Sequence, residues 1–517
     1  MALMLAGSWT SSVLAEPLET RGALPLGSVI QATLSGNRDI LIRGAQLDGT
    51  EAAVTQAQGA FDATVTAGML RNEDRRPANQ PERLLLPGLG EQRNSGATAF
   101  VGMEKRLQSG IALTGIASST YADDRISAQQ GMPSQTTRKI TFGLRVPLAR
   151  GAGDNFAKAT LRAAERERDA ATDQKLFSVS LALRDATVAY WEYLSRWREL
   201  EIARTGEQRT AGLLEELRKL IAADEIPAAE LDLAVANHAE RSAAHIAAEQ
   251  ALLEARQALS RLMGLSAEQF ATVTKPVTEF PGIEGKEPRI PGTAELVGWA
   301  YASRGDWLAA EFQHSALQDR VAAARDLTRP QIDVALNVSS AGLREGAAVN
   351  QTGGLFAGTS AGPSVTAQVS IQFPVQNLVA QGQFRQAAAI ATESAIRLEA
   401  LKAEIASAVL IAAADLKRVA QVLQVSGEIV RRYSRTLENE RIKRRLGVAT
   451  LIDEINVEDR YYRALVDDVR RRRDYASGLV RLRHEIGGLV RGSEDGFAVH
   501  EADFLGIKQP VVGYRRE

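Results

Sequence analysis

Two long stretches without proline, 155–222 and 381–446, restrict most strongly how this chain can fold. Their apolar periodicity predicts one helix over each stretch. At 1.5 Å per residue, a helix of about 68 residues is roughly 100 Å long, whereas the mean globular helix has about 11–12 residues. A helix of this length needs partners along its whole side, so the sequence predicts an extended wall of helices.

The chain contains the same unit twice, over 24–265 and 291–489, with a linker rich in Pro, Gly and charge at 266–290. The pattern in each copy predicts the same order of elements: a leading helical segment, a strand, a Gly-rich polar loop, a second strand, the long helix and a returning helix. The leading segments are 25–60 and 293–329. The returning helices end at Gly264 and Gly487, because Gly is the commonest residue just past a helix end. Each leading and returning pair, stacked end to end, matches the long helix in length.

Four segments alternate between apolar and polar residues with period two, which predicts strands with two different faces. They are 61–69, 140–146, 332–338 and 365–373. A lipid-facing barrel around water requires this alternation, but a soluble sheet with one buried face alternates in the same way. The first copy has two further strand-like segments, 97–107 and 110–121. They are either a hairpin in an extracellular loop or an added pair of strands.

Composition excludes several classes of protein. The 62 basic and 63 acidic residues leave a net charge of −1, so no general attraction to nucleic acid is expected. The absence of cysteine excludes disulfides, thiol nucleophiles and an acylated N-terminal Cys. No apolar run approaches 18 residues, so a membrane could be crossed only by a closed barrel.

The two ends of the chain are expected to lie outside the repeated units. Residues 1–15 are predicted to be a signal peptide, because Val13 and Ala15 fit the small-residue pattern before a signal-peptidase cut. The alternative for this segment is a disordered N-terminal tail. Residues 490–517 are predicted to be a polar C-terminal tail.

This ordered and duplicated set of parts resembles the TolC-type outer-membrane efflux protein family (the outer membrane factors), from about Leu24 to Leu489. The motifs that support the resemblance are Phe61-Asp62, 147–151 and 445–453. It implies an α+β membrane protein in which two tandem repeats give long α-helical hairpins, a coiled-coil tunnel, and transmembrane strands of a barrel shared by a homotrimer.

The resemblance also implies what the protein does and where. It implies a channel in the cell outer membrane, in contact with its lipid, with the helical tunnel in the periplasm. The channel would belong to a tripartite efflux pump or a type I secretion system, and its partners would be a periplasmic adaptor (membrane fusion protein) and an inner-membrane transporter. It would be no enzyme and carry no cofactor. A periplasmic coiled-coil adaptor or scaffold is the alternative, although it leaves the paired strands unexplained.

By resemblance, Asp453 lines the constriction at the periplasmic entrance, where three copies would form a ring of carboxylates. Such rings select cations in pores. A second acidic position expected one turn later is Asn456 here, with Glu454 nearby. The alternative role for Asp453 is an N-terminal carboxylate that stabilises its own helix.

The two helix turns at the same end are the predicted adaptor contacts. The residues are Ala223, Ile226 and Pro227 in one turn and Arg445, Gly447 and Val448 in the other. The alternative is that these residues only form the turns.

Other patterns carry no chemistry. Gly151-Ala152-Gly153 lacks the Lys-Ser/Thr of a phosphate loop. His238 and His245 lie seven residues apart, without the i, i+4 spacing of a zinc pair, and no metal site is predicted. The basic run 470–473 is expected to pair with neighbouring carboxylates such as Asp467, Asp468 and Asp474.

Overall fold

The structure is a computed structural model that describes residues 22–85, 87–88, 90–223, 229–282, 290–346, 359–360, 362–493 and 496–510. The predicted signal peptide, and Ile226 and Pro227 of the predicted adaptor turns, therefore lie outside the described residues. The chain divides into two compact units. One comprises Met1–Asp48, Ala170–Glu311 and Leu398–Glu517, and the other comprises Gly49–Asp169 and Phe312–Arg397.

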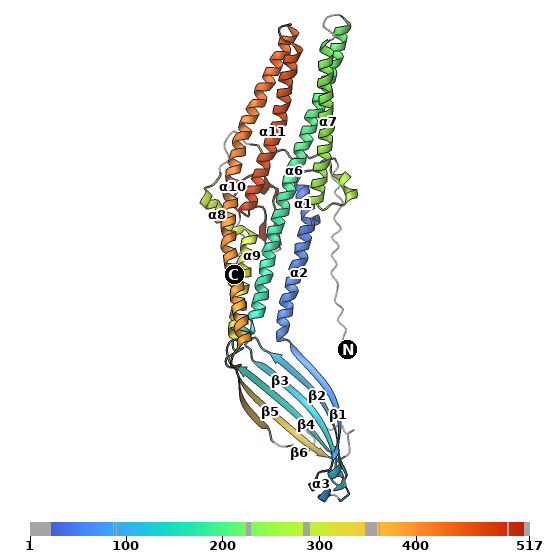
Figure 1. The fold of residues 1–517 in the computed structure, drawn as a ribbon, viewed down its shortest axis with the longest axis vertical. Helices are drawn as coiled ribbons and strands as arrows, with labels where there is room; N and C mark the ends of the chain where they lie inside the picture. The colour runs from blue at the N-terminus through green and yellow to red at the C-terminus, as the bar shows by residue number, and fades with distance from the viewer. Residues whose placement is uncertain are drawn as a thin grey trace. The chain divides into compact units, whose positions relative to one another are not determined.

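Both long helices are present, because neither stretch contains a proline that would remove a backbone donor. They are α6, Ala159–Ala222, with 64 residues, and α10, Leu378–Arg445, with 68 residues. The predicted stretch 155–222 is interrupted near its start, at a turn at Lys158. The returning helices are α7, Ala229–Leu262, and α11, Leu451–Glu485. Figure 1 shows the two pairs, α6 with α7 and α10 with α11, as long hairpins.

The leading helical segments are each broken, so the prediction of one continuous helix over 25–60 and over 293–329 was wrong. The four helices are α1, Leu26–Gly36; α2, Arg38–Gln58; α8, Thr293–Ser303; and α9, Gly305–Asp326. The breaks fall at Asn37 and Arg304, whose ψ angles of 124° and 122° are extended. Both side chains bind a returning helix: Asn37 Nδ2 donates to Leu262 O at 2.8 Å, and Arg304 Nη1 lies 2.5 Å from the Glu485 carboxylate.

The predicted glycine ends of the returning helices are confirmed. Gly264 and Gly487 have φ angles of +76° and +71°. In each case the glycine N–H and the following N–H donate back to the last turn, as Leu265 N does to Ser260 O at 3.1 Å. This is the Schellman motif, which needs a left-handed residue and therefore favours glycine.

Helix α11 takes part in two hydrophobic cores of the first unit. On one side Val480 and Ala476 pack with Trp191, Tyr190 and Leu259 of α6 and α7. On the other side Leu479, Leu482 and Ile486 pack with residues of α8 and α10 such as Leu296 and Leu416. Helix α11 is therefore packed on two sides, and each long helix has lateral partners in this unit.

The segment after Leu489 was predicted to be a polar tail, and its described part corrects that prediction. It contains β8, Arg491–Ser493; β9, Gly496–Ala498; and a 3₁₀ turn, η3, Glu501–Phe504. Phe504 is fully buried in the core with α1 and α6. Arg483 of α11 is also fully buried and donates to the carbonyls of Asp503, Lys508 and Gly488. This apolar anchor and these hydrogen bonds hold the segment to the helices.

Part of the predicted linker 266–290 also has defined contacts. It begins with η2, Ala267–Thr272, and then forms a short parallel bridge between Leu24 and Pro276. Leu24 N donates to Lys275 O at 2.8 Å, and the Tyr190 hydroxyl accepts from Thr278 N at 3.0 Å. The beginning of the first repeat is thereby fixed to the segment that joins the two repeats.

His484, near the end of α11, is buried without a counter-charge among its contacts. Its Nδ1 lies 2.9 Å from Ser180 Oγ, and its ring packs against Phe177. Burial lowers its pKa to about 3, and the positive charges of Arg184 and Arg304 add to this effect. The imidazole is therefore neutral in the folded protein at any ordinary pH.

This buried histidine predicts acid sensitivity. In the unfolded chain a histidine titrates near pH 6.5, so below that pH the unfolded state binds a proton that the folded state does not. The free energy of unfolding is unaffected by this group above about pH 6.5 and decreases as the pH falls toward 3. At pH 5 the decrease is about 2 kcal/mol. We expect His484→Asn to show a smaller loss of unfolding free energy between pH 8 and pH 5 than the wild type, measured by urea unfolding. Equal losses in both proteins would contradict the assignment.

The second unit contains one antiparallel sheet and the ends of four helices. In chain order, its strands are β1, Ala63–Pro77; β2, Glu91–Arg106; β3, Ala112–Asp124; β4, Gln135–Pro147; β5, Gln331–Glu345; β6, Thr359–Ser360; and β7, Ser364–Gln372. Strands β1 to β5 each pair with the next, and β6 and β7 both pair with the same edge of β5, one after the other. The extra segments of the first copy are thus an added strand pair, which settles the choice that the sequence left open.

Short elements complete this unit. They are η1, Gly59–Phe61; α3, Gln80–Leu85; α4, Arg125–Gln129; and α5, Asp154–Ala157. Beside the sheet, α6 and α9 are joined by Arg162 and Arg166, which both reach Asp319, at 3.3 and 3.0 Å. None of the helices in the described ranges has the length and hydropathy that a membrane span needs.

Candidate functional site

The turn between α10 and α11 consists of two capping motifs that follow each other directly in the sequence. Helix α10 ends at Arg445, and Gly447, with φ +74°, closes a Schellman motif in which Val448 N donates to Lys443 O at 3.0 Å. Helix α11 begins with Thr450 as its N-cap. The turn that the sequence singled out is therefore a defined structure.

Asp453 forms a capping box with Thr450. The Thr450 hydroxyl and backbone N–H both donate to Asp453 Oδ2, at 2.6 and 3.0 Å, and Asp453 N donates back to the hydroxyl at 3.3 Å. Hydrogen bonds from Thr450 lower the pKa of the Asp453 carboxyl. The side chain is exposed, as is that of Asn456 one turn later. Asp453 thus carries both the helix-capping role, which was the alternative prediction, and a charge available on the surface.

Glu454 does not share this exposed face. Only 6% of it is exposed, and its carboxylate accepts from Arg441 Nε at 3.2 Å and from Arg444 of α10. Arg441 also donates to Glu458 at 3.1 Å, and burial raises the pKa of the Glu458 carboxyl. Glu454 was grouped with Asp453 at the predicted constriction, but its charge joins the two helices of the hairpin instead.

The surface of the α10–α11 turn is apolar at its tip and basic at its base. Leu446 and Val448 are 73% and 72% exposed, and Arg445 and Gly447 are exposed between and beside them. Ala223, the described member of the other predicted contact turn, is exposed as well. Exposed large apolar side chains at a structured turn are typical of a surface that a partner covers.

The two hairpins touch close to these turns. Leu451, the first residue of α11, is buried with Leu214, Leu217 and Ala234 of α6 and α7. Arg444 of α10 lies 3.7 Å from Glu216 of α6. Movement of one turn in this unit would therefore disturb the packing of the other.

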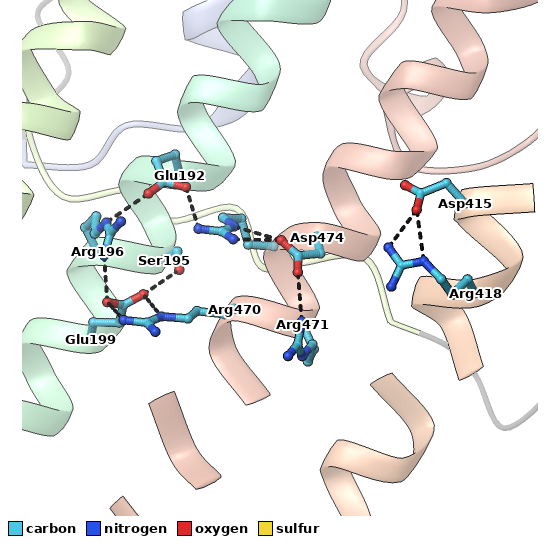
Figure 2. Close-up of polar contacts among 10 residues, drawn as sticks. Glu192, Ser195, Arg196, Glu199, Asp415, Arg418, Arg470, Arg471 and Asp474 are labelled. Atoms are coloured by element: carbon cyan, nitrogen blue, oxygen red, sulfur yellow. Dashed lines mark hydrogen bonds and ion pairs between the residues drawn. The ribbon is translucent and has the colours of Figure 1, made fainter. Parts of the chain in front are cut away.

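A set of arginines joins α6 to α11 farther along the hairpins, as Figure 2 shows. Arg473 donates to Glu192 at 2.8 Å, and Arg470 lies 3.3 Å from Glu199, which also accepts from Arg196 at 2.9 Å. The predicted local pairing of the basic run is confirmed for Arg472 with Asp468 and for Arg473 with Asp474, both at 2.7 Å. The contacts to α6 were missed, because the sequence does not indicate which helix lies opposite.

The two histidines of α7 have ordinary partners. His238 Nδ1 lies 3.0 Å from Thr210 Oγ1, and His245 Nδ1 lies 2.6 Å from Glu207, both on α6. Within the ranges that the structure describes, no three His, Cys, Asp or Glu residues are grouped to hold a metal ion. Both histidines fasten α7 to α6.

The chain is similar to solved structures of outer-membrane channels. The outer-membrane channel OprN has a TM-score of 0.64 at 16% identity, over 89% of each chain. The outer membrane protein VceC of Vibrio cholerae has a TM-score of 0.62 at 15% identity, over 90% of this chain and 96% of that one. The CmeC channel of Campylobacter jejuni has a TM-score of 0.64 at 12% identity, over 89% and 85%.

No family model matches the chain, and no curated protein sequence matches it. At these identities the similarity is one of fold. The chain therefore has the fold of the outer-membrane channels, and the predicted α+β class with long helical hairpins and a set of strands is confirmed.

Proposed function

We propose that this protein is an outer-membrane channel that conducts solutes passively from the periplasm to the exterior, as part of a tripartite efflux pump or a type I secretion system. The observation that carries the proposal is the two-faced sheet. Its register places apolar side chains from every long strand on one face, and each of these strands has exposed apolar side chains there, for example Val65, Phe142 and Ile371 at 66–71%. A soluble sheet with this alternation would bury that face.

An uncovered apolar face of this size needs lipid against it. The proposal therefore sets the sheet in the outer membrane and the helical hairpins in the periplasm, with the chain acting as a homotrimer. The alternative function, a periplasmic adaptor or scaffold, does not explain an exposed apolar sheet face, because a protein surrounded by water would bury it. Extraction from membranes separates the two, because the channel requires detergent and the scaffold is released by salt or high pH.

The proposed gate uses the exposed face of α11 that begins with Asp453. In a homotrimer this residue and Asn456 recur three times around one axis, and capping by Thr450 holds each Asp453 carboxylate in place and ionised. A ring of three fixed carboxylates attracts cations and repels anions. Glu454 is left out of the ring, because its ion pairs with Arg441 and Arg444 face α10.

The proposed adaptor contact is the exposed turn formed by Arg445, Gly447 and Val448, together with Ala223, Ile226 and Pro227 between α6 and α7. The exposed apolar residues of the α10–α11 turn and the basic last turn of α10 favour a partner with an apolar contact surface and acidic groups at its rim. The inner-membrane transporter would act through this adaptor.

Asp453→Ala tests the gate directly. We expect the purified trimer in planar bilayers to lose cation preference, with the ratio of cation to anion permeability falling several-fold, and to become less sensitive to block by divalent cations. The matched control is Asp415→Ala, which removes a partly exposed α10 carboxylate paired with Arg418. An Asp453→Ala channel with wild-type selectivity would refute the gate, and protein that never forms channels would refute the function.

A further inference from the structure

The two copies of the repeated unit differ in their strands. In each copy one strand follows the leading helices and another precedes the long helix: β1 and β4 in the first copy, β5 and β7 in the second. Between β1 and β4 the first copy carries the hairpin of β2 and β3, Glu91–Asp124. Among the described residues, the second copy has only the two-residue β6 at the corresponding place. Compared with the described part of the second copy, the first copy therefore has one extra hairpin.

This extra hairpin is a full part of the sheet. Strands β2 and β3 have 16 and 13 residues, as long as their neighbours, and each is paired along its length on both sides. One cross-strand row runs Ala67, Val101, Ala117 and Ile140, and the next row on the same face runs Val65, Met103, Gly115 and Phe142. Facing residues of antiparallel strands point to the same side, so the apolar face continues across the hairpin without a gap.

The opposite face is continuous too, and it is mostly polar. Its rows include Thr66, Gly102, Ile116 and Thr141, and Thr64, Glu104, Thr114 and Gly143. Glu104 of the hairpin lies 3.8 Å from Arg145 of β4 on this face. The hairpin thus matches the other strands in both its lipid-facing and its water-facing side chains.

The sheet has two free edges. In the ranges that the structure describes, β1 pairs only with β2, and β7 only with β5. Free edges are not tolerated in lipid. The sheet has six strand positions that alternate in direction, so β7 of one copy would run antiparallel to β1 of the next. A second copy of this chain is the occupant that both edges fit.

We propose that the β2–β3 hairpin widens the mouth of the channel, because three copies close a ring of eighteen strands where the duplicated pattern alone would give twelve. This proposal rests on the trimeric channel proposed above. With strands about 4.8 Å apart and tilted by about 40°, the ring has a backbone diameter of roughly 36 Å instead of roughly 24 Å. The cross-section is about twice as large, so the mouth would admit bulky hydrated solutes that a twelve-stranded ring would exclude.

The first experiment asks whether the hairpin lies in the ring. The chain has no cysteine, so a single introduced cysteine provides the only thiol that a maleimide can label. We expect Val101→Cys on β2 to react with a membrane-impermeant maleimide at least about tenfold more slowly than Ser118→Cys, on the polar face of β3. The matched pair on β7 is Val369→Cys and Thr366→Cys, which face lipid and water respectively.

The outcomes separate the two proposals. If Val101→Cys reacts as fast as Ser118→Cys while Val369→Cys stays protected, the hairpin lies outside the ring and the wide mouth is refuted, but the channel stands. If both lipid-face cysteines react fast, the sheet does not lie in lipid and the channel itself is refuted. Protection of both positions supports the proposal.

The second experiment measures the width. In Thr366→Cys, polyethylene glycol maleimides of graded size are added from outside, and the largest that reacts is recorded. We expect deletion of 91–124 to lower the limiting diameter about 1.5-fold. Should the shortened chain fail to assemble, the limit of the full-length channel decides by itself, since a limit at the twelve-strand size overturns the proposal.

Discussion

Replacing Gly264 by alanine is expected to lower the free energy of unfolding by roughly 2–5 kcal/mol. Gly264 ends the returning helix α7 with φ +76°, in the left-handed region that costs an L-residue about 1–2 kcal/mol. A Cβ at this position would also lie 1.9 Å from Gly36 O and 2.3 Å from Gly36 C. Both are backbone atoms of α1, so no side-chain rotation can relieve the collision.

The contact explains why two glycines occur together. A Cβ on Gly36 would in turn lie 2.5 Å from Met263 O, so the ends of α1 and α7 touch backbone to backbone. Next to this contact, Asn37 breaks the leading helix and donates to Leu262 O. An alanine at 264 would therefore separate the two helix ends and weaken this hydrogen bond as well.

Two glycines serve as matched controls. Gly447 has φ +74° but nothing within 4 Å of its Cβ position, so Gly447→Ala should cost only the conformational term of about 1–2 kcal/mol. Gly212 lies within α6 with open space around it, and Gly212→Ala should stabilise by up to about 1 kcal/mol. Thermal unfolding followed by circular dichroism would measure all three. A Gly264→Ala loss no greater than that of Gly447→Ala would contradict the close approach.

The parts of the fold that depend on local pattern could be predicted from the sequence. Helix length follows from periodicity without proline, and the glycine ends at Gly264 and Gly487 follow from the preference for left-handed residues there. Strand alternation predicted the two faces of the sheet. The breaks at Asn37 and Arg304 could not be predicted, because the periodicity runs through them and partners far along the chain, near 262 and 485, hold the extended conformation.

The candidate site was predicted in part for the same reason. The turn and its glycine are local features of the sequence, and Asp453 was singled out by the resemblance. The capping pair of Asp453 with Thr450 was not predicted, although a Thr followed three residues later by an acidic residue is a local signal for it. The orientation of Glu454 depends on Arg441 and Arg444, which lie on the preceding helix. A signal was present in the spacing. Glu454 and Glu458 lie four residues apart on α11 and so share one face of the helix, and Arg441 and Arg444 lie three residues apart at the end of α10.

Removing the buried Arg483 side chain should have an effect of similar size at the opposite end of α11. Arg483 and Asp503 are each 1% exposed, and Arg483 Nη2 lies 3.2 Å from Asp503 Oδ1. The same guanidinium donates to the carbonyls of Asp503, Lys508 and Gly488, so one side chain fastens the segment after α11. Arg483→Met leaves a buried carboxylate without this ion pair, which typically costs about 3–5 kcal/mol.

We expect the Arg483→Met protein to release residues 491–508, exposing Phe504, which is otherwise fully buried beside α1. Limited proteolysis should then cut within this segment at a protease concentration that leaves the wild type intact, and Tm should fall. The double variant Arg483→Met/Asp503→Leu should recover a large part of the loss, because replacing both members of a buried ion pair by apolar residues is often nearly neutral. If the single variant keeps wild-type Tm and protease resistance, Arg483 does not hold the segment. If the double variant is no more stable than the single one, the lost carbonyl hydrogen bonds, and not the ion pair, carry the energy.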